Sequence, residues 1–123
     1  MTVLIDSWAW IEYFKGSDYG IKAKSVIESG EQLLVSSINI SEIYHFFLRH
    51  KMDANNLIKF VLDSSFVIPL DTSLALRAAN IKFTKKLGMA DAIVIATAEE
   101  NNAKILTGDD DFKNIKNVIY IGK

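Results

Sequence analysis

Short apolar runs alternate with amphipathic stretches along the 123 residues of the chain. Runs of apolar residues bounded by polar or turn-forming residues predict strands. The predicted strands are Val3–Ile5, Gln32–Ser36, Phe66–Leu70, Lys104–Thr107 and Val118–Ile121. The stretches between them place apolar residues at helical spacing. The predicted helices are Ser7–Phe14, Ser17–Glu28, Ile40–Arg49, Asn55–Leu62, Thr72–Leu87 and Ala90–Asn101, with Gly88 expected to end the fifth.

Strands that alternate with helices predict an α/β fold with a mostly parallel sheet covered on both faces. The predicted strands are apolar on both sides, as expected for buried parallel strands. The sequence has no repeat, low-complexity segment or linker, and its length suits one domain over residues 1–123. Ligands bind at the carboxyl ends of the strands in such sheets, so functional residues are expected there.

Acidic residues follow two of the predicted strands directly. Asp6 ends the first strand, and Asp109–Asp111 follow the strand Lys104–Thr107 after one glycine. In a parallel sheet both groups lie at the same edge. The alternatives are a helix N-cap for Asp6 and a polar turn for Asp109–Asp111. Three adjacent carboxylates repel one another, however, and a bound cation would relieve that repulsion.

Two further acidic residues lie within predicted helices. Asp91 belongs to a helix that is apolar on nearly all sides, and a buried carboxylate is costly unless it is paired or binds a metal. Its alternative role is again an N-cap. Glu42 lies at the edge of an apolar stripe, where most glutamates are simply solvated, and periodicity alone does not select it.

Composition narrows the class of protein. Half of the residues are hydrophobic and cysteine is absent, which excludes disulfides and thiolate metal sites and fits a reducing compartment. The first residues form a short apolar run without a basic region, so neither a signal peptide nor a membrane span is expected, and the expected location is the cytoplasm. The net charge of −1 argues against binding nucleic acid by phosphate neutralisation alone, but less against a metal-dependent enzyme, since the cation supplies positive charge.

Other kinds of site find little support. His45 and His50 are five residues apart and so point to different sides of a helix. They therefore do not form a credible zinc pair. The sequence has no phosphate-binding loop, no dinucleotide-binding glycine motif and no serine nucleophile elbow. The remaining candidate chemistry therefore rests on the carboxylates.

The acidic residues and their surroundings, taken in order, resemble those of PIN domains, and in particular VapC-type toxins. The matching segments are Leu4–Ile11 around Asp6, Ser41-Glu42, Ala90–Ala98 around Asp91, and Ile105–Phe112 around Asp109 and Asp111. Each motif alone is common, but all four in this order across one α/β chain are fairly specific. Trp8 departs from the family pattern, which expects a small residue near this position, and its ring would narrow the site.

The resemblance implies a three-layer α/β/α sandwich with four to five strands, divalent-metal-dependent RNA cleavage, a homodimer and inhibition by a cognate antitoxin. The implied catalytic residues, which also hold the metal, are Asp6, Glu42, Asp91 and Asp109, with Asp111 as an additional metal residue. Their hard oxygen ligands suit Mg²⁺ or Mn²⁺. Such a metal lowers the pKa of a water molecule and stabilises charge on the scissile phosphate. Ser7 and Thr107 are expected to donate hydrogen bonds to the acidic residues.

Residues outside the acidic motifs give two further hypotheses. Lys82, Lys85 and Lys86 share one helical face and are candidate RNA contacts, the alternative being a solvated outer face. Trp8 or Tyr13 is a candidate to line a groove for the antitoxin beside the active site, the alternative being cover by the helix Ser17–Glu28.

Three other functions remain open at this stage. One is a PIN fold without catalysis that serves as an interaction module, because fold alone does not fix function. Another is a PIN nuclease that acts in RNA processing or on DNA. The third is a phosphoryl-transfer enzyme with a strand-end aspartate, but its pattern needs an acidic residue two positions after Asp6, where Trp8 stands.

Overall fold

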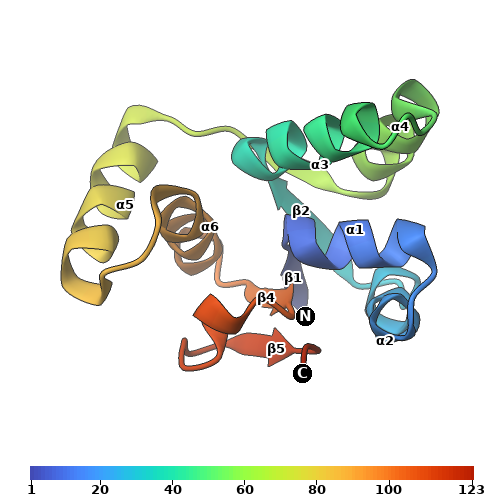
Figure 1. Ribbon diagram of the computed structural model, residues 1–123. Coiled ribbons are helices and arrows are strands. Elements are labelled where there is room, and N and C mark those ends of the chain that lie inside the picture. The colour runs from blue at the N-terminus through green and yellow to red at the C-terminus, as the bar shows by residue number, and fades with distance from the viewer.

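The computed structural model describes all residues 1–123 as one parallel sheet with helices on both sides (Figure 1). In chain order the elements are β1 (Thr2–Ile5), α1 (Ser7–Lys15), α2 (Asp18–Ile27), β2 (Gln32–Ser36), α3 (Ser37–Arg49), α4 (Ala54–Ser64), β3 (Phe66–Ile68), α5 (Thr72–Lys85), α6 (Met89–Glu100), β4 (Lys104–Thr107), the 3₁₀-helix η1 (Asp110–Phe112) and β5 (Val118–Tyr120). No helix is both long enough and apolar enough to span a membrane.

The five strands pair in the order β3-β2-β1-β4-β5, and every pair is parallel. β1 lies in the centre, with Leu4 opposite Leu34 of β2 and Ile105 of β4. Because all strands run the same way, the residues that follow β1 and β4 lie at one edge of the sheet. The predicted parallel α/β sheet is confirmed.

Two apolar cores, one on each face of the sheet, hold the layers together. Val3 and Ile5 of β1 pack with α1 to α4 on one face, while Leu4 between them packs with α5 and α6 on the other (Figure 1). This alternation follows from the two-residue period of a strand. Trp10 in the first core and Phe112 in the second are fully buried. The fold is therefore the three-layer α/β/α sandwich that the resemblance implies.

The strand β3 differs from its prediction. Phe66 and Val67 are 63% and 40% exposed, because β3 is an edge strand with one neighbour, so the expectation of burial on both sides is wrong here. The strand also ends at Ile68, two residues early. Pro69 has no N–H to donate, and the N–H of Leu70 donates to the Ser37 hydroxyl instead of a neighbouring strand.

Two helix boundaries also differ from expectation. The helix α5 ends at Lys85, and Lys86, not Gly88, takes the left-handed conformation after it, with φ of 56°. Gly88 is extended and instead precedes α6 as its N-cap. The helix α3 begins at Ser37, three residues before the predicted start at Ile40, because the Ser36 side chain accepts a hydrogen bond from the N–H of Ile38. This earlier start places Asn39 on the helix.

Candidate active site

Asp6 lies at the carboxyl end of the central strand and is 95% buried, with only 5% of its surface exposed. Its carboxylate accepts hydrogen bonds from the Thr107 hydroxyl at 2.8 Å and from the Asn39 amide at 3.2 Å. Asp6 holds the N-cap position of α1, but its side chain makes no capping hydrogen bond to that helix. Burial raises the pKa of Asp6 to about 6, against the opposing effect of the Thr107 hydrogen bond. The N-cap alternative therefore does not explain this side chain.

Asp91 lies in the first turn of α6, whose N-cap is Gly88, so Asp91 is not an N-cap. The helix is buried from Ala92 to Ala98, which fixes its first turn against the end of the sheet. Carboxylate oxygens of Asp91, Asp109 and Asp111 all lie within 4.8 Å of one another. Desolvation, followed by the charges of the neighbouring carboxylates, raises the pKa of Asp91 to about 7.

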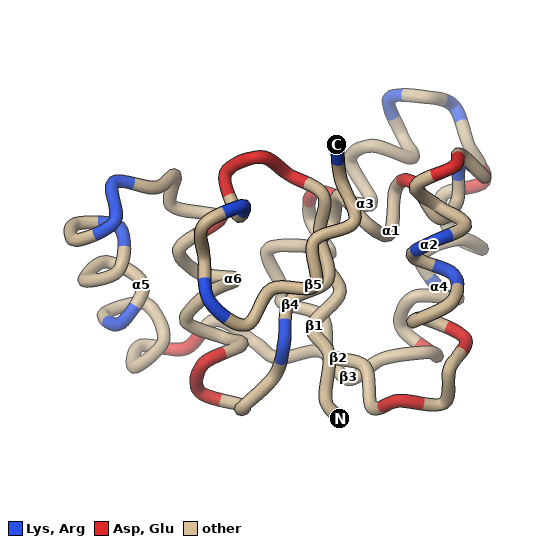
Figure 2. The backbone as a smooth tube through the Cα atoms, turned by 90° about the horizontal axis from the view of Figure 1, so that it is seen from below, with Lys and Arg blue, Asp and Glu red and all other residues tan.

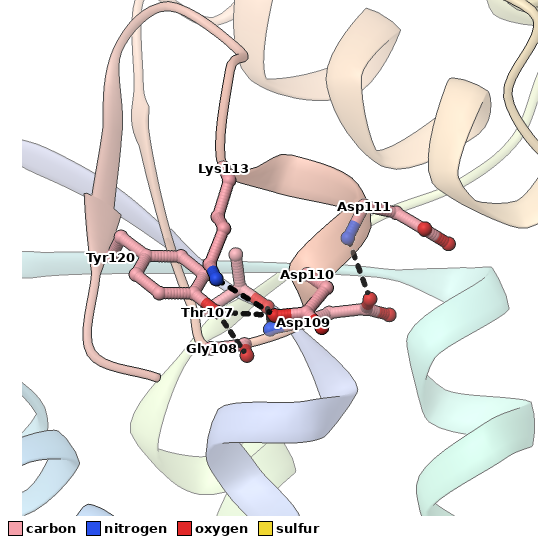
Figure 3. Close-up of polar contacts among 7 residues, drawn as sticks. All are labelled: Thr107, Gly108, Asp109, Asp110, Asp111, Lys113 and Tyr120. Carbon is pink, nitrogen blue, oxygen red and sulfur yellow. Dashed lines mark hydrogen bonds and ion pairs between the residues drawn. The ribbon is translucent and has the colours of Figure 1, made fainter. Parts of the chain in front are cut away.

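The loop after β4 turns the Asp110 carboxylate away from those of Asp109 and Asp111 (Figure 3). Asp109 accepts a hydrogen bond from the backbone N–H of Asp111 at 3.0 Å, which closes a tight turn. The Asp110 carboxylate instead lies beside the hydroxyl of Tyr120 and the ammonium of Lys113, and these two groups lower its pKa. The polar-turn alternative is thus correct for the backbone, while Asp109 and Asp111 still meet Asp91.

Glu42 lies on the exposed side of α3, yet it is tied to the same site. Its carboxylate accepts a hydrogen bond from the Ser7 hydroxyl at 2.8 Å. Its charge is among those that raise the pKa of both Asp6 and Asp91. The expected hydrogen bonds from Ser7 and Thr107 to acidic residues are therefore both present. We call the five residues Asp6, Glu42, Asp91, Asp109 and Asp111 the acidic cluster.

Asn39 is a polar residue of this site that the sequence did not reveal. It is fully buried, and its amide nitrogen lies 3.2 Å from Asp6 and 3.4 Å from Glu42, so it bridges the two carboxylates. Its amide oxygen has no hydrogen-bond partner. The available signal was an asparagine between two isoleucines, three residues before Glu42 and so on the same helical face. The predicted helix began one residue too late to include it.

The acidic cluster has no protein cation to balance it. No lysine or arginine forms an ion pair with any of its five members. Figure 2 shows the acidic segment after β4 beside the C-terminal end of the chain, whereas the basic residues of α5 lie apart from it. Like charges this close favour either protonation or a bound cation.

The lysines of α5 are not gathered at the acidic cluster. The Lys82 ammonium donates to the carbonyl of Leu87 at 2.9 Å. Lys85 lines a cavity with Lys104, the first residue of β4, which lies at the opposite edge of the sheet from the acidic cluster. Lys85 therefore lies away from the acidic cluster. The RNA contact stays a prediction for all three lysines.

Trp8 and Tyr13, paired in one hypothesis, line two different cavities. Tyr13 lies in an open cavity of about 430 Å³ between α1, α2 and α4. Trp8 lies in a separate cavity of about 370 Å³ together with Asp109 and Asp110. Both side chains are half-buried, and α2 covers part of each: Tyr19 packs against Trp8, and Glu28 accepts a hydrogen bond from the Tyr13 hydroxyl.

A parallel sheet with this strand order and five carboxylates at its carboxyl edge defines a class of α/β protein with a candidate metal site. The family model described as "PIN domain" matches residues 3–118 of the chain. The chain therefore belongs to the PIN-domain family. A comparison with curated protein sequences gave no significant match.

Solved structures with the same fold include several toxin–antitoxin proteins. A toxin–antitoxin complex from Klebsiella pneumoniae is 24% identical, with a TM-score of 0.83 and 98% of both chains covered. VapBC2 from Rickettsia felis, bound to a DNA fragment from its promoter, is 16% identical, with a TM-score of 0.76 and 98% and 97% of the two chains covered. Mycobacterium tuberculosis VapC20, described as a sarcin–ricin loop cleaving toxin, is 17% identical, with a TM-score of 0.79 and coverages of 94% and 96%. At these identities the likeness concerns the fold.

Proposed function

We propose that the chain is a divalent-metal-dependent endoribonuclease, the toxin of a VapBC-type toxin–antitoxin pair. It hydrolyses phosphodiester bonds of RNA in the cytoplasm and acts as one nuclease domain over residues 1–123. The observation that carries this proposal is the convergence of Asp91, Asp109 and Asp111, whose oxygens lie within 4.8 Å of one another at the same sheet edge as Asp6. The family membership and the toxins among the solved structures of this fold support it.

The acidic cluster fits a hard divalent cation. Its donors are carboxylate oxygens, which Mg²⁺ and Mn²⁺ prefer, and neither sulfur nor imidazole lies among them. The raised pKa of Asp91, with no basic partner nearby, is the electrostatic condition that a cation relieves. When bound, such a metal lowers the pKa of a water molecule and stabilises charge on the scissile phosphate.

The residues of the acidic cluster and their hydrogen-bond partners have separate roles in this proposal. Asp91, Asp109 and Asp111 would hold the metal together with Asp6, and their rigid supports are the first turn of α6, the turn after β4 and β1. Thr107 and Asn39 fix the Asp6 carboxylate by hydrogen bonds and so preserve its orientation. Glu42 sits at the exposed side of the cluster, oriented by Ser7, where it can accept a proton from an incoming water.

A metal titration tests the proposal most directly. Calorimetry with Mn²⁺ should give saturable binding to the wild-type chain, and Asp91→Asn should weaken it at least tenfold because one of three close ligands is lost. Asp63→Asn is the matched control, since Asp63 is exposed on α4 and pairs with Lys59. Equal Mn²⁺ binding by wild type and Asp91→Asn would contradict the site, and absence of RNA cleavage at saturating Mn²⁺ would contradict the activity.

We propose the cavity beside Tyr13 as the binding site for the antitoxin. It lies between α1, α2 and α4 and is lined by Phe14, Ile21 and Phe60, of which Ile21 and Phe60 are 64% and 41% exposed. An apolar, open cavity of about 430 Å³ suits the apolar side chains of a partner helix. In a binding assay with the proposed antitoxin, Phe60→Ala should weaken the complex by roughly tenfold or more. Unchanged affinity in both Phe60→Ala and Tyr13→Ala would exclude this cavity.

A further inference from the structure

The second cavity near the site joins aromatic rings to the acidic cluster. Trp8, Tyr19, Gly108, Asp109, Asp110 and Lys123 line this open cavity of about 370 Å³. Trp8 follows Asp6 by two residues at the start of α1, and Asp109 belongs to both the cavity and the acidic cluster. A molecule that occupies the cavity therefore lies beside the acidic cluster.

The Trp8 ring is held in place on two sides. Its centroid lies 5.4 Å from that of Tyr19, with the ring planes at 65°, an edge-to-face contact. On the other side its six-membered ring rests on Gly108, where a Cβ atom would collide with the ring and with the backbone of Gly122. A ring fixed in this way loses little conformational entropy when a second aromatic group stacks on it.

The polar groups of the cavity suit a nucleotide. The Tyr120 hydroxyl lies 3.0 Å from both the Gly108 carbonyl and Asp110, so it stiffens the wall that carries Asp109 (Figure 3). Lys123 brings the one basic side chain that lines the cavity, and a neighbouring phosphate can pair with it. Aromatic rings next to a backbone-cleaving site are the feature by which proteins bind unstacked bases of single-stranded RNA.

We propose that Trp8, backed by Tyr19 and Gly108, forms a stacking platform for the nucleobase next to the cleaved phosphodiester bond. The platform rests on the proposed ribonuclease function and adds a base-binding subsite to it. The bulky Trp8 ring fits beside Asp6 because it packs over Gly108. The hydrogen bonds of Asp6 with Thr107 and Asn39 stay intact.

A direct binding test uses the two tryptophans of the chain. Trp10 is fully buried, whereas Trp8 is half-buried in the cavity, so ligand-dependent fluorescence changes report on Trp8. Adenosine 5′-monophosphate with Mg²⁺ should quench this signal saturably, and ribose 5-phosphate, which lacks the base, should bind roughly 5- to 150-fold more weakly. Trp8→Leu should remove that preference, Trp8→Phe should keep most of it, and Phe66→Leu, a remote exposed aromatic on β3, should leave it unchanged.

Cleavage kinetics then show which base of the substrate contacts Trp8. In an oligoribonucleotide with single abasic positions, one position beside the cut should lower kcat/KM of the wild type by roughly 5- to 150-fold, mainly through KM. Trp8→Leu should show that loss with the intact substrate and little further loss at the abasic position, because the two changes remove the same contact. Melting temperatures close to wild type ensure that folding does not account for these effects.

The outcomes separate the two proposals. Nucleotide binding at Trp8 without RNA cleavage refutes the ribonuclease and leaves a base-binding site at Trp8 with no cleaved bond beside it. RNA cleavage without any response of Trp8 to nucleotide overturns the platform alone. A Trp8 signal that responds to the antitoxin but not to adenosine 5′-monophosphate also overturns it, in favour of a protein contact.

Discussion

Asp91 has a pKa of about 7 because burial and the surrounding carboxylates both disfavour its charge. Replacing that charge should remove function without removing structure. Asp91→Asn and Asp6→Asn should each lower RNA cleavage by at least roughly a hundredfold, since an amide is a poor ligand for a hard cation. Circular dichroism should show unchanged secondary structure. Full activity of either purified variant in Mg²⁺ would remove that residue from the site.

The same raised pKa values predict how stability depends on pH. Asp6 and Asp91 have pKa values of about 6 and 7 in the folded chain, against an ordinary value of 3.8. Between about pH 4 and pH 7 the folded state therefore binds more protons than the unfolded state, and the free energy of unfolding falls as pH rises. Thermal scans in EDTA should show this fall.

Two changes should reduce the loss of stability at high pH. Asp91→Asn should melt higher than wild type in EDTA above pH 7, with the difference vanishing near pH 4, because only the charged carboxylate is destabilising. Millimolar Mn²⁺ should also raise the melting temperature of the wild type above pH 7, since it binds the native state. A wild-type melting temperature that rises between pH 4 and pH 7 in EDTA, measured against the Asp63→Asn control, would contradict the assignment.

Asn39 supports two carboxylates at once, so its loss should affect function more than folding. Asn39→Ala should weaken Mn²⁺ binding or cleavage by roughly 10- to 100-fold, the usual effect of removing a partner of a metal-binding carboxylate. Asn80→Ala, at an exposed position on α5, is the control. Calorimetry and initial rates are the measurements, and wild-type values for both would show that Asn39 only fills space.

Helices α1 and α2 approach closely at Gly20, where a Cβ atom would collide with the backbone carbonyl of Glu12. Gly20→Ala should therefore lower the free energy of unfolding by about 1–3 kcal/mol, because one helix must move away from the other. Asn80→Ala, at an exposed position within α5, is the control. Urea denaturation followed by circular dichroism compares the two, and equal midpoints would disprove the close approach.

Elements could be predicted where one local signal dominates. The strands Gln32–Ser36 and Lys104–Thr107 match their predicted bounds because each is an apolar run between polar ends. The end of β3 and the start of α3 were missed for a different reason. They depend on hydrogen bonds of Leu70 to Ser37 and of Ile38 to Ser36, and competing short-range partners of this kind leave little trace in hydrophobic periodicity.

At the scale of the whole molecule, α5 exposes two large apolar side chains to solvent. Leu76 and Phe83 are 66% and 85% exposed and lie seven residues apart, on the same face of the helix. We predict that this face pairs two copies of the chain, because exposed apolar side chains of this size mark protein interfaces. Light scattering should give twice the 13.8 kDa chain mass for wild type and the single mass for Phe83→Glu. Phe66→Glu should stay dimeric, and a monomeric wild type would refute the prediction.

The sequence by itself determined the alternation of strands and helices, the parallel sheet and the positions of Asp6 and Asp109 at strand ends. These features follow from local periodicity and from the rule that parallel strands end at one edge. Asp91 was selected by its place in a helix that is apolar on nearly all sides, although a capping role stayed open. Glu42 was assigned through the family motif alone, since helical periodicity could not separate a metal ligand from a solvated glutamate.

Only the tertiary structure decided which side chains meet. It brought Asn39 between Asp6 and Glu42, turned Asp110 away from Asp109 and Asp111, and set Trp8 over Gly108. The side chains in these contacts take their directions from the way the helices pack on the sheet. Sequence spacing fixes the face of an element on which a residue lies, but the distance between two faces exists only after the layers have packed.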